Sequence, residues 1–263
     1  MDKNNKKLTR KKSGRLIFAA LITVFIFVGA IAAYNLIKTE LEYNTAQNEY
    51  AELRQWAPAH TPSPAGSGSN DESSDETGSN STPEPATDSN PDLSVFNPDY
   101  IGWIRIDGTD IDYPVVQGSN NTKYLNTTFM GDRNPSGTIF MDSECSNGFT
   151  GFAIIHGHNM RNGSMFAGLH NFRDSEFLAK HNEITIFTPE GEVLVFRIFD
   201  VILTDIYDAV FELPVEGQEA FTEYFREYNL AGHYLRDRSG ILVLSTCTDG
   251  NRNERLLILT ARQ

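Results

Sequence analysis

Two short apolar runs near the C-terminus bring a thiol and a guanidinium group close in the sequence. The run 241–244 leads into Leu-Ser-Thr-Cys, which ends at Cys247, and Arg255 opens a second apolar run over 256–259. The polar segment 248–254 joins them, so the two runs are predicted to be adjacent antiparallel strands. If Cys247 pairs with Arg255, both side chains project from one face of the sheet. A thiol that attacks a carbonyl needs a group that stabilises the oxyanion, so this pattern indicates covalent catalysis.

The base for such a thiol is predicted to be His158. It follows the apolar strand 152–155 in the sequence His-Gly-His-Asn, where the strand gives way to a loop. Catalytic groups favour such strand ends. His156 lies two positions earlier on the same strand face, which makes a zinc pair an alternative, but no third ligand is apparent and we expect no metal.

Several other motifs follow one another along the chain. They are Ile-Gly-Trp-Ile at 101–104, Ile-Asp-Tyr-Pro-Val-Val-Gln at 111–117, Gly-Thr-Ile-Phe-Met-Asp at 137–142, Gly-His-Asn-Met at 157–160 and Gly-Ser-Met-Phe at 163–166. Together with Leu-Ser-Thr-Cys and the arginine after it, this set resembles the sortases of Gram-positive bacteria, class B in particular. Sortases are membrane-anchored cysteine transpeptidases. The resemblance covers most of the chain from about Pro98 to Arg262.

The resemblance implies a role for each site residue. Cys247 is the expected nucleophile, His158 the proton donor to the leaving amine, and Arg255 the group that stabilises the oxyanion. The strand pattern, and not the resemblance, makes Ser245, on the same strand face as Cys247, and Thr246 beside it candidates for substrate binding. No metal or organic cofactor is expected.

The resemblance also implies the partners. The expected substrates are surface proteins with a C-terminal sorting signal of the Asn-Pro-x-Thr type, which is cleaved after Thr to leave an acyl-thioester. The expected acceptor is an amine, either of a peptidoglycan precursor of the cell wall or of a pilin lysine. Two alternatives are a hydrolytic cysteine protease with the same machinery and a non-catalytic surface-binding domain.

Three assignments at the site have competitors in the sequence. Arg252 competes with Arg255 for the oxyanion role, although Arg255 directly precedes the apolar run, as the family's arginine does. Asp249 is a candidate for orienting His158, but an aspartate beside a glycine is more often turn chemistry. The chain has two cysteines, and a disulfide between Cys145 and Cys247 would consume the nucleophile.

The N-terminus has the composition of a membrane anchor. Residues 1–15 hold seven basic residues and one acidic residue, and a predominantly apolar span of 16–37 follows. At about 1.5 Å per residue such a helix is long enough to cross the hydrocarbon core of a bilayer. The basic residues before it predict a cytoplasmic N-terminus and an extracellular catalytic domain at the cell membrane. A cleaved signal peptide is the alternative, because small residues at positions 30 and 32 have a suitable spacing for cleavage.

The rest of the chain divides by composition. We expect a juxtamembrane helical segment at 38–56, a disordered linker rich in Ser, Gly, Pro, Asn and acidic residues at 57–92, and a catalytic domain at 93–263. The net charge is −13 overall. Beyond residue 15 there are 15 basic and 34 acidic residues, a net charge of −19. Such a surface argues against nucleic-acid binding.

The catalytic domain is predicted to be mainly β. Eight short β-like runs separated by turn signals predict a sortase-like closed or nearly closed barrel of seven to eight strands with short flanking helices. We expect helices at 165–169, 174–179 and 218–228, the last in an insertion at about 204–239 before the cysteine strand. In the family this insertion forms one wall of the substrate groove; the alternative is that its aromatic residues pack the helix onto the barrel.

Overall fold

The structure is a computed structural model of the 263-residue chain. It describes residues 3–58, 93–215, 217–228, 240–251 and 253–263. The chain forms two compact units, residues 1–46 and residues 47–263. The expected linker at 57–92 lies outside the described residues from position 59 onward.

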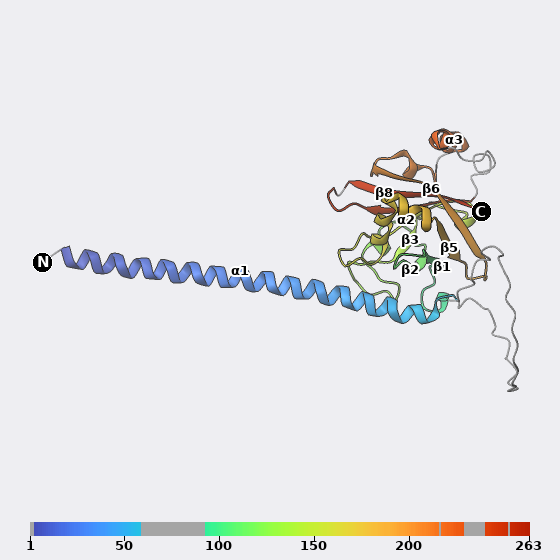
Figure 1. Ribbon diagram of the computed structural model, residues 1–263. Helices are drawn as coiled ribbons and strands as arrows, with labels where there is room; N and C mark the ends of the chain where they lie inside the picture. Colours follow the sequence, from blue (N-terminus) through green and yellow to red (C-terminus); the bar gives the residue numbers. More distant parts are fainter. Residues whose placement is uncertain (1–2, 59–92, 216, 229–239, 252) are drawn as a thin grey trace, which may run out of the picture. The chain divides into compact units, whose positions relative to one another are not determined.

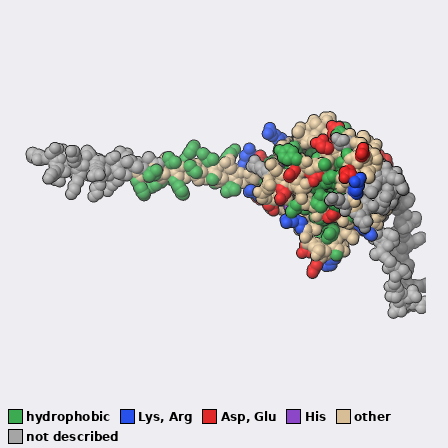
Figure 2. All heavy atoms as spheres, turned by 90° about the horizontal axis from the view of Figure 1, so that it is seen from above, with side chains coloured by type: hydrophobic (Ala, Val, Ile, Leu, Met, Phe, Trp, Pro, Cys, Tyr) green, Lys and Arg blue, Asp and Glu red, His purple; other side chains and the backbone are tan. Residues whose placement is uncertain are grey.

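Helix α1 spans Lys3–Leu53, across the expected basic tail and apolar span and most of the expected juxtamembrane segment. Together with the 3-10 turn η1 (Arg54–Trp56) it contains an 18-residue window of mean hydropathy 2.0 that is long and apolar enough to cross a membrane. None of that window is buried, and Figure 2 shows its apolar side chains around the helix. An exposed helix that is apolar all round is typical of a segment embedded in lipid. A membrane anchor and a signal sequence both fit this finding.

Eight strands close into a single barrel (Figure 1). They are β1 (Tyr100–Arg105), β2 (Asp112–Val116), β3 (Ile139–Met141), β4 (Phe152–His156), β5 (Glu183–Phe187), β6 (Val193–Asp205), β7 (Ile241–Cys247) and β8 (Glu254–Arg262). Their order around the barrel is β1-β2-β3-β4-β7-β8-β6-β5, and β5 pairs with β1. The pairs β2–β3 and β4–β7 are parallel and the others antiparallel. The predicted closed β-barrel is therefore confirmed, and closure gives each of these strands a neighbour on both sides.

Short helices connect the strands. They are η2 (Leu93–Val95), η3 (Lys123–Leu125), η4 (Gly148–Thr150), η5 (Phe166–Arg173), α2 (Ser175–Lys180), η6 (Ala209–Glu212), α3 (Gln218–Tyr224) and η7 (Phe225–Glu227). Helix α2 begins at an aspartate cap, because the Asp174 side chain accepts hydrogen bonds from the backbone N–H groups of Glu176 and Phe177. The three predicted helical regions are all helical, with ends shifted by a few residues.

The insertion between β6 and β7 packs on the outside of the barrel. Phe221 and Phe225 are fully buried against Phe152 of β4, with ring centroids 5.4 and 6.2 Å from it. Val243 of β7 and Leu257 of β8 belong to the same apolar cluster. The aromatic residues of α3 and η7 thus attach the insertion to the sheet, as the packing alternative predicts. Residues 229–239 of the insertion lie outside the described residues.

The chain just after residue 46 is part of the barrel unit. The Tyr50 hydroxyl donates to the Gly137 carbonyl at 2.5 Å, and its ring meets Tyr113 edge-on. Arg54 Nε donates to the Asp112 carbonyl at 3.2 Å. Tyr50 is only 3% exposed, so this segment contributes to the core of the unit that carries the site.

Candidate active site

Strands β7 and β8 place a thiol and a guanidinium opposite one another. Cys247 is the last residue of β7, and its partner in the antiparallel ladder is Arg255, which meets the condition under which both side chains project from one face of the sheet. Cys247 is partly exposed, whereas the six residues before it in β7 are buried. The apolar strand is held on both sides, by β4 and by β8, and it delivers the thiol to the barrel's rim. Arg255 Nη1 donates to the Glu254 carbonyl at 3.0 Å, which restrains the guanidinium beside its own strand.

His158 reaches the same region from the neighbouring strand β4. Its position depends on Gly157, where the backbone passes so close to Phe166 and Ile139 that a Cβ atom would lie 2.6 and 2.7 Å from their side chains. Beyond it the loop is closed by a hydrogen bond from the Phe166 N–H to the His158 carbonyl at 2.9 Å. The glycine of the Gly-His-Asn motif is therefore required by packing.

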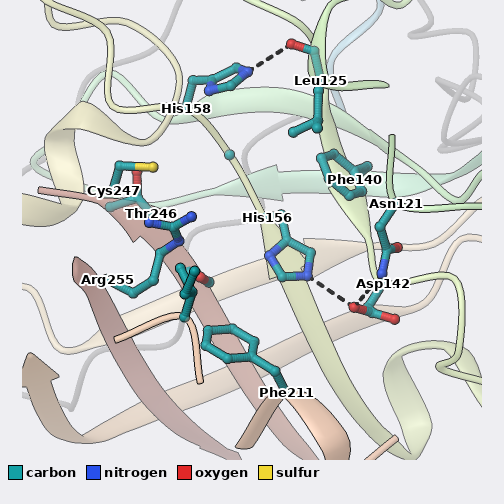
Figure 3. A pocket seen from close by; sticks show the side chains of 13 residues that line it. Asn121, Leu125, Phe140, Asp142, His156, His158, Phe211, Thr246, Cys247 and Arg255 are labelled. Carbon is teal, nitrogen blue, oxygen red and sulfur yellow. Dashed lines mark hydrogen bonds and ion pairs between the residues drawn. The ribbon is translucent and has the colours of Figure 1, made fainter. Parts of the chain in front are cut away.

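The orientation of the His158 ring is fixed by a main-chain carbonyl. Nε2 lies 2.7 Å from the Leu125 carbonyl oxygen. A carbonyl only accepts, so Nε2 carries a proton and donates it to this bond. The other ring nitrogen, Nδ1, lies on the side of Cys247 (Figure 3). Nδ1 is therefore the nitrogen that remains for proton exchange.

One cavity of about 410 Å³ is lined by all five residues expected at the site. His158, Ser245, Thr246, Cys247 and Arg255 line it (Figure 3). The other lining residues are Asn121, Leu125, Phe140, Asp142, His156, Gly157, Ile206 and Phe211. The cavity is of a size that admits a few residues of an extended peptide.

The two loops at the rim are joined directly. Asn159 Nδ2 donates to Asp249 Oδ1 at 2.8 Å, which connects the loop after β4 to the loop after β7. Asp249, the candidate for orienting His158, thus contacts the residue next to it. Thr248 Oγ1 donates to Glu254 Oε2 at 2.7 Å and braces the β7–β8 connection. Arg252, the competitor of Arg255, lies outside the described residues.

The comparisons with known proteins agree with this geometry. The model of the sortase domain family matches residues 104–263. The chain belongs to the sortase family. Over 164 residues it is 33% identical to sortase B of Listeria monocytogenes, a match that covers 59% of this chain and 65% of that protein, just under two thirds of its length.

Solved sortase B structures share the fold of this sortase. A mutant form of Clostridium perfringens sortase B matches with a TM-score of 0.58 and 32% identity, over 65% of this chain and 84% of that one. A Streptococcus pyogenes class B sortase involved in pilus biogenesis matches with a TM-score of 0.56 and 30% identity, over 65% of this chain and 96% of that one. The barrel unit is therefore sortase B-like.

The cavity of this sortase also contains a hydrogen-bonded group of His156, Asp142 and Asn121, an association that the sequence did not predict. His156 Nε2 is 3.2 Å from Asp142 Oδ2, and Asn121 Nδ2 donates to the same oxygen at 2.8 Å. Burial on its own would raise the pKa of Asp142, but these two hydrogen bonds, the Glu144 N–H and the positive charge of His156 when it is protonated lower it below its usual value. The imidazole lies between Phe140 and Phe211, with ring centroids 5.2 and 6.2 Å away.

The zinc alternative finds no geometric support. His156 and His158 have different partners, a carboxylate and a main-chain carbonyl. Within the described ranges, no group of three or more His, Cys, Asp or Glu side chains could hold a metal ion. Strand periodicity alone does not separate the two histidines, because they are two residues apart at the end of β4; the Gly-His-Asn motif is what singled out His158.

The residues that precede the thiol are buried. Ser245 and Thr246 are 3% and 2% exposed, and the Ser245 carbonyl accepts a hydrogen bond from Gly157 N–H at 3.1 Å. Within the part of the chain that the structure describes, the buried Thr246 hydroxyl oxygen has no hydrogen-bond partner. Their expected role in substrate binding stays a prediction.

The second cysteine is buried in the core and does not line the cavity. Cys145 is 3% exposed, and its sulfur accepts a hydrogen bond from the Ile154 N–H at 3.4 Å. The Cys145 and Cys247 sulfurs are not joined to each other in this structure. In this arrangement Cys247 is not consumed by a disulfide, and its thiol is left for nucleophilic attack.

Proposed function

We propose that this sortase B-like protein is a membrane-anchored cysteine transpeptidase in which Cys247 is the nucleophile. The observation that carries the proposal is the shared cavity. Cys247 and Arg255 face each other across β7 and β8, and His158 lines the same 410 Å³ space from the loop after β4. These are the three groups that covalent acyl transfer needs: a thiol, a proton carrier and an oxyanion partner.

The first half of the reaction forms an acyl-thioester. The Cys247 thiolate attacks the carbonyl carbon of the substrate threonine, and the carbonyl electron pair moves to oxygen. The Arg255 guanidinium donates hydrogen bonds to that oxyanion. As the oxyanion collapses, the carbon–nitrogen bond breaks and the leaving amine takes a proton from His158. Because Nε2 is engaged with Leu125, the proton comes from Nδ1.

The second half transfers the acyl group to an amine. The amine attacks the thioester carbonyl, His158 takes up the proton that the amine loses, and the carbon–sulfur bond breaks to regenerate the thiolate. The new bond is an amide, so no net oxidation or reduction takes place. Transfer exceeds hydrolysis only if the amine reaches the thioester more readily than water does.

The proposed substrates are surface proteins with an Asn-Pro-x-Thr-like C-terminal signal. The proposed acceptor is an amine of a cell-wall precursor. A pilin lysine is the second candidate, because one similar class B sortase is involved in pilus biogenesis. We further propose that the apolar helix anchors the protein in the membrane with its N-terminus in the cytoplasm, and that the barrel unit acts outside the cell.

The test uses the full-length protein in detergent micelles and peptides that carry the signal. Products are read by mass spectrometry with and without glycine-based and lysine-based amine acceptors. We expect peptide cleavage after threonine, an acyl adduct on Cys247 and an acylated amine. Cys247→Ala should abolish all three, while Cys145→Ala, the matched control at the other cysteine, should retain them.

The outcomes separate the alternatives. Turnover by the Cys247→Ala variant would refute the assignment of the nucleophile. Cleavage without any acylated amine, whatever the acceptor, would favour a hydrolytic protease. Binding of the peptide with neither cleavage nor adduct would favour a non-catalytic binding domain.

A further inference from the structure

A histidine without any sequence signal contacts the main chain of Cys247. His170 Nε2 lies 3.0 Å from the Cys247 carbonyl oxygen, and the two residues are 77 positions apart. The carbonyl only accepts, so His170 Nε2 carries the proton and donates it. A neutral imidazole protonated at Nε2 and an imidazolium both meet this requirement.

The ladder between β7 and β8 leaves this carbonyl without a partner on the β8 side. Thr248 N–H donates to the Glu254 carbonyl at 3.4 Å. Hydrogen-bonded and non-hydrogen-bonded pairs alternate along an antiparallel ladder. The next pair, Cys247 and Arg255, is therefore of the non-hydrogen-bonded kind, and the Cys247 carbonyl points away from β8.

The strand on the other side ends too early to supply a partner. β4 pairs with β7 only as far as His156, opposite Ser245, and the Ser245 carbonyl receives the Gly157 N–H. The Cys247 carbonyl lies two residues further along β7, beyond the last donor of that ladder. The hydrogen bond to His170 is partly buried, and a carbonyl removed from water is unfavourable without a donor. His170 supplies the hydrogen bond that a longer β4 would have provided.

The helix that carries His170 is itself firmly held. Phe166, Leu169 and Phe172 of η5 are at most 1% exposed. Their burial fixes the backbone on both sides of His170, so the imidazole is presented from a packed element. The hydrogen bond thus ties the end of β7 to the core at the point where the chain leaves the sheet for the polar loop.

We propose that His170 is a positioning residue for the nucleophile. It holds the peptide plane after Cys247 and so restricts the direction of the Cα–Cβ bond and of the thiol relative to His158 and Arg255. The proposal rests on the proposed function of Cys247. His170 acts through the main chain and touches no reacting atom, so its removal should lower kcat and leave KM for the peptide nearly unchanged.

The experiment compares three substitutions in the full-length protein. His170→Gln places an N–H near the position of Nε2, His170→Asn is too short to reach the carbonyl, and His170→Leu removes the donor. His181→Leu is the matched control, because that histidine packs on Phe177, with ring centroids 4.6 Å apart, outside the cavity. Each variant is measured for kcat and KM with the signal peptide and for thermal unfolding.

A second readout does not depend on the transpeptidase reaction. The rate at which iodoacetamide alkylates Cys247, followed by the mass of the modified peptide, reports the reactivity of the thiol in the protein alone. We expect the Leu and Asn variants to show a kcat on the order of ten- to a hundredfold lower, the cost typical of a displaced catalytic group. Their alkylation should be slower, and the Gln variant should recover most of both rates.

The results separate positioning from mere stability. If His170→Leu keeps the kcat and alkylation rate of His181→Leu, the proposal is wrong. If His170→Leu does not fold, the Gln and Asn variants decide, and equal rates for these two would overturn the proposal. If the unmodified protein cleaves no peptide, the proposed function fails, while the alkylation rates still show whether His170 positions the thiol.

Discussion

Arg255 allows a direct test of how the oxyanion is stabilised. The side chain faces Cys247 across the ladder, and Nη1 is bound to the Glu254 carbonyl at 3.0 Å. The guanidinium lines the same cavity as Cys247, where it can donate hydrogen bonds to an oxyanion formed on a bound substrate. Arg255→Ala removes these donors and the charge together, whereas Arg255→Lys keeps a charge but loses the planar fork.

The size of the effect follows from the role. Loss of one preorganised oxyanion donor typically lowers kcat by about 10²–10³, or about 2.7–4 kcal/mol of transition-state stabilisation. We expect Arg255→Ala to fall in this range. Arg255→Lys should be intermediate, with roughly a tenfold loss, which corresponds to about 1.4 kcal/mol. KM should change little in both variants, because the oxyanion exists only after the thiol has attacked.

The assay is single-turnover formation of the acyl-enzyme from a signal peptide, with steady-state kcat and KM beside it. Arg197→Ala is the matched control. That arginine lies on β6 with a side chain 58% exposed and pairs with Glu183 at 3.1 Å, an exposed ion pair of a kind worth about 0–1 kcal/mol. It should leave the rates unchanged. The oxyanion role would be refuted if the Arg255→Ala variant formed the acyl-enzyme as fast as Arg197→Ala, or if its KM rose while its kcat stayed unchanged.

Two predictions concern the stability of the barrel unit. Tyr50→Phe removes the hydroxyl that donates to the Gly137 carbonyl, so we expect the free energy of unfolding, measured with denaturant, to fall by about 1–2 kcal/mol. Tyr207→Phe, at a side chain 82% exposed, is the control and should leave it unchanged. Equal unfolding midpoints for the two variants would contradict a stabilising role of the Tyr50 hydrogen bond. The folded-state pKa of Asp142 is depressed, so its ionised form stabilises the fold above the unfolded pKa of about 3.9, and this contribution disappears as pH falls through the lower folded value. The stability difference between the natural protein and Asp142→Asn, measured by urea unfolding from pH 7 to pH 2, should therefore shrink below about pH 4, and a constant difference would show that ionisation of Asp142 contributes nothing.

The barrel could be predicted from the sequence because its evidence is local. Each strand appears as a short apolar run between turn residues, and the adjacency of the two runs that end at Cys247 and begin after Arg255 follows from a connection of only seven residues. The register that sets Cys247 opposite Arg255 comes from the structure. The helix of the insertion was also predictable, because its aromatic residues recur at helical spacing. It begins at Gln218 as predicted, but the α-helix ends at Tyr224 and the chain continues as the 3-10 helix η7, since the end of a helix depends on local caps and packing.

The rest of the site depends on contacts between distant segments. Leu125 orients His158 across 33 residues, and Asp142 meets His156 only because β3 and β4 pair in the barrel. A single sequence does not show these pairings. The attachment of Tyr50 to Gly137, across 87 residues, is of the same kind. From composition, residues 38–56 were expected to form a segment separate from the catalytic domain. The structure instead places residues 47–56, which include Tyr50, in the same compact unit as the barrel.

His170 shows why such residues escape a reading of motifs. Motifs report side chains whose chemistry is used directly, and His170 instead completes the hydrogen bonding of a carbonyl that the fold leaves without a strand partner. The need for His170 follows from three features of the barrel. β4 stops at His156, β7 continues for two residues beyond its pairing with β4, and Cys247 forms a non-hydrogen-bonded pair with β8. None of these three features can be derived before the strand pairing of the barrel is known. The nucleophile thus lies at a strand end that is accessible because its neighbour is short, and the same shortness creates the need for a positioning side chain from η5.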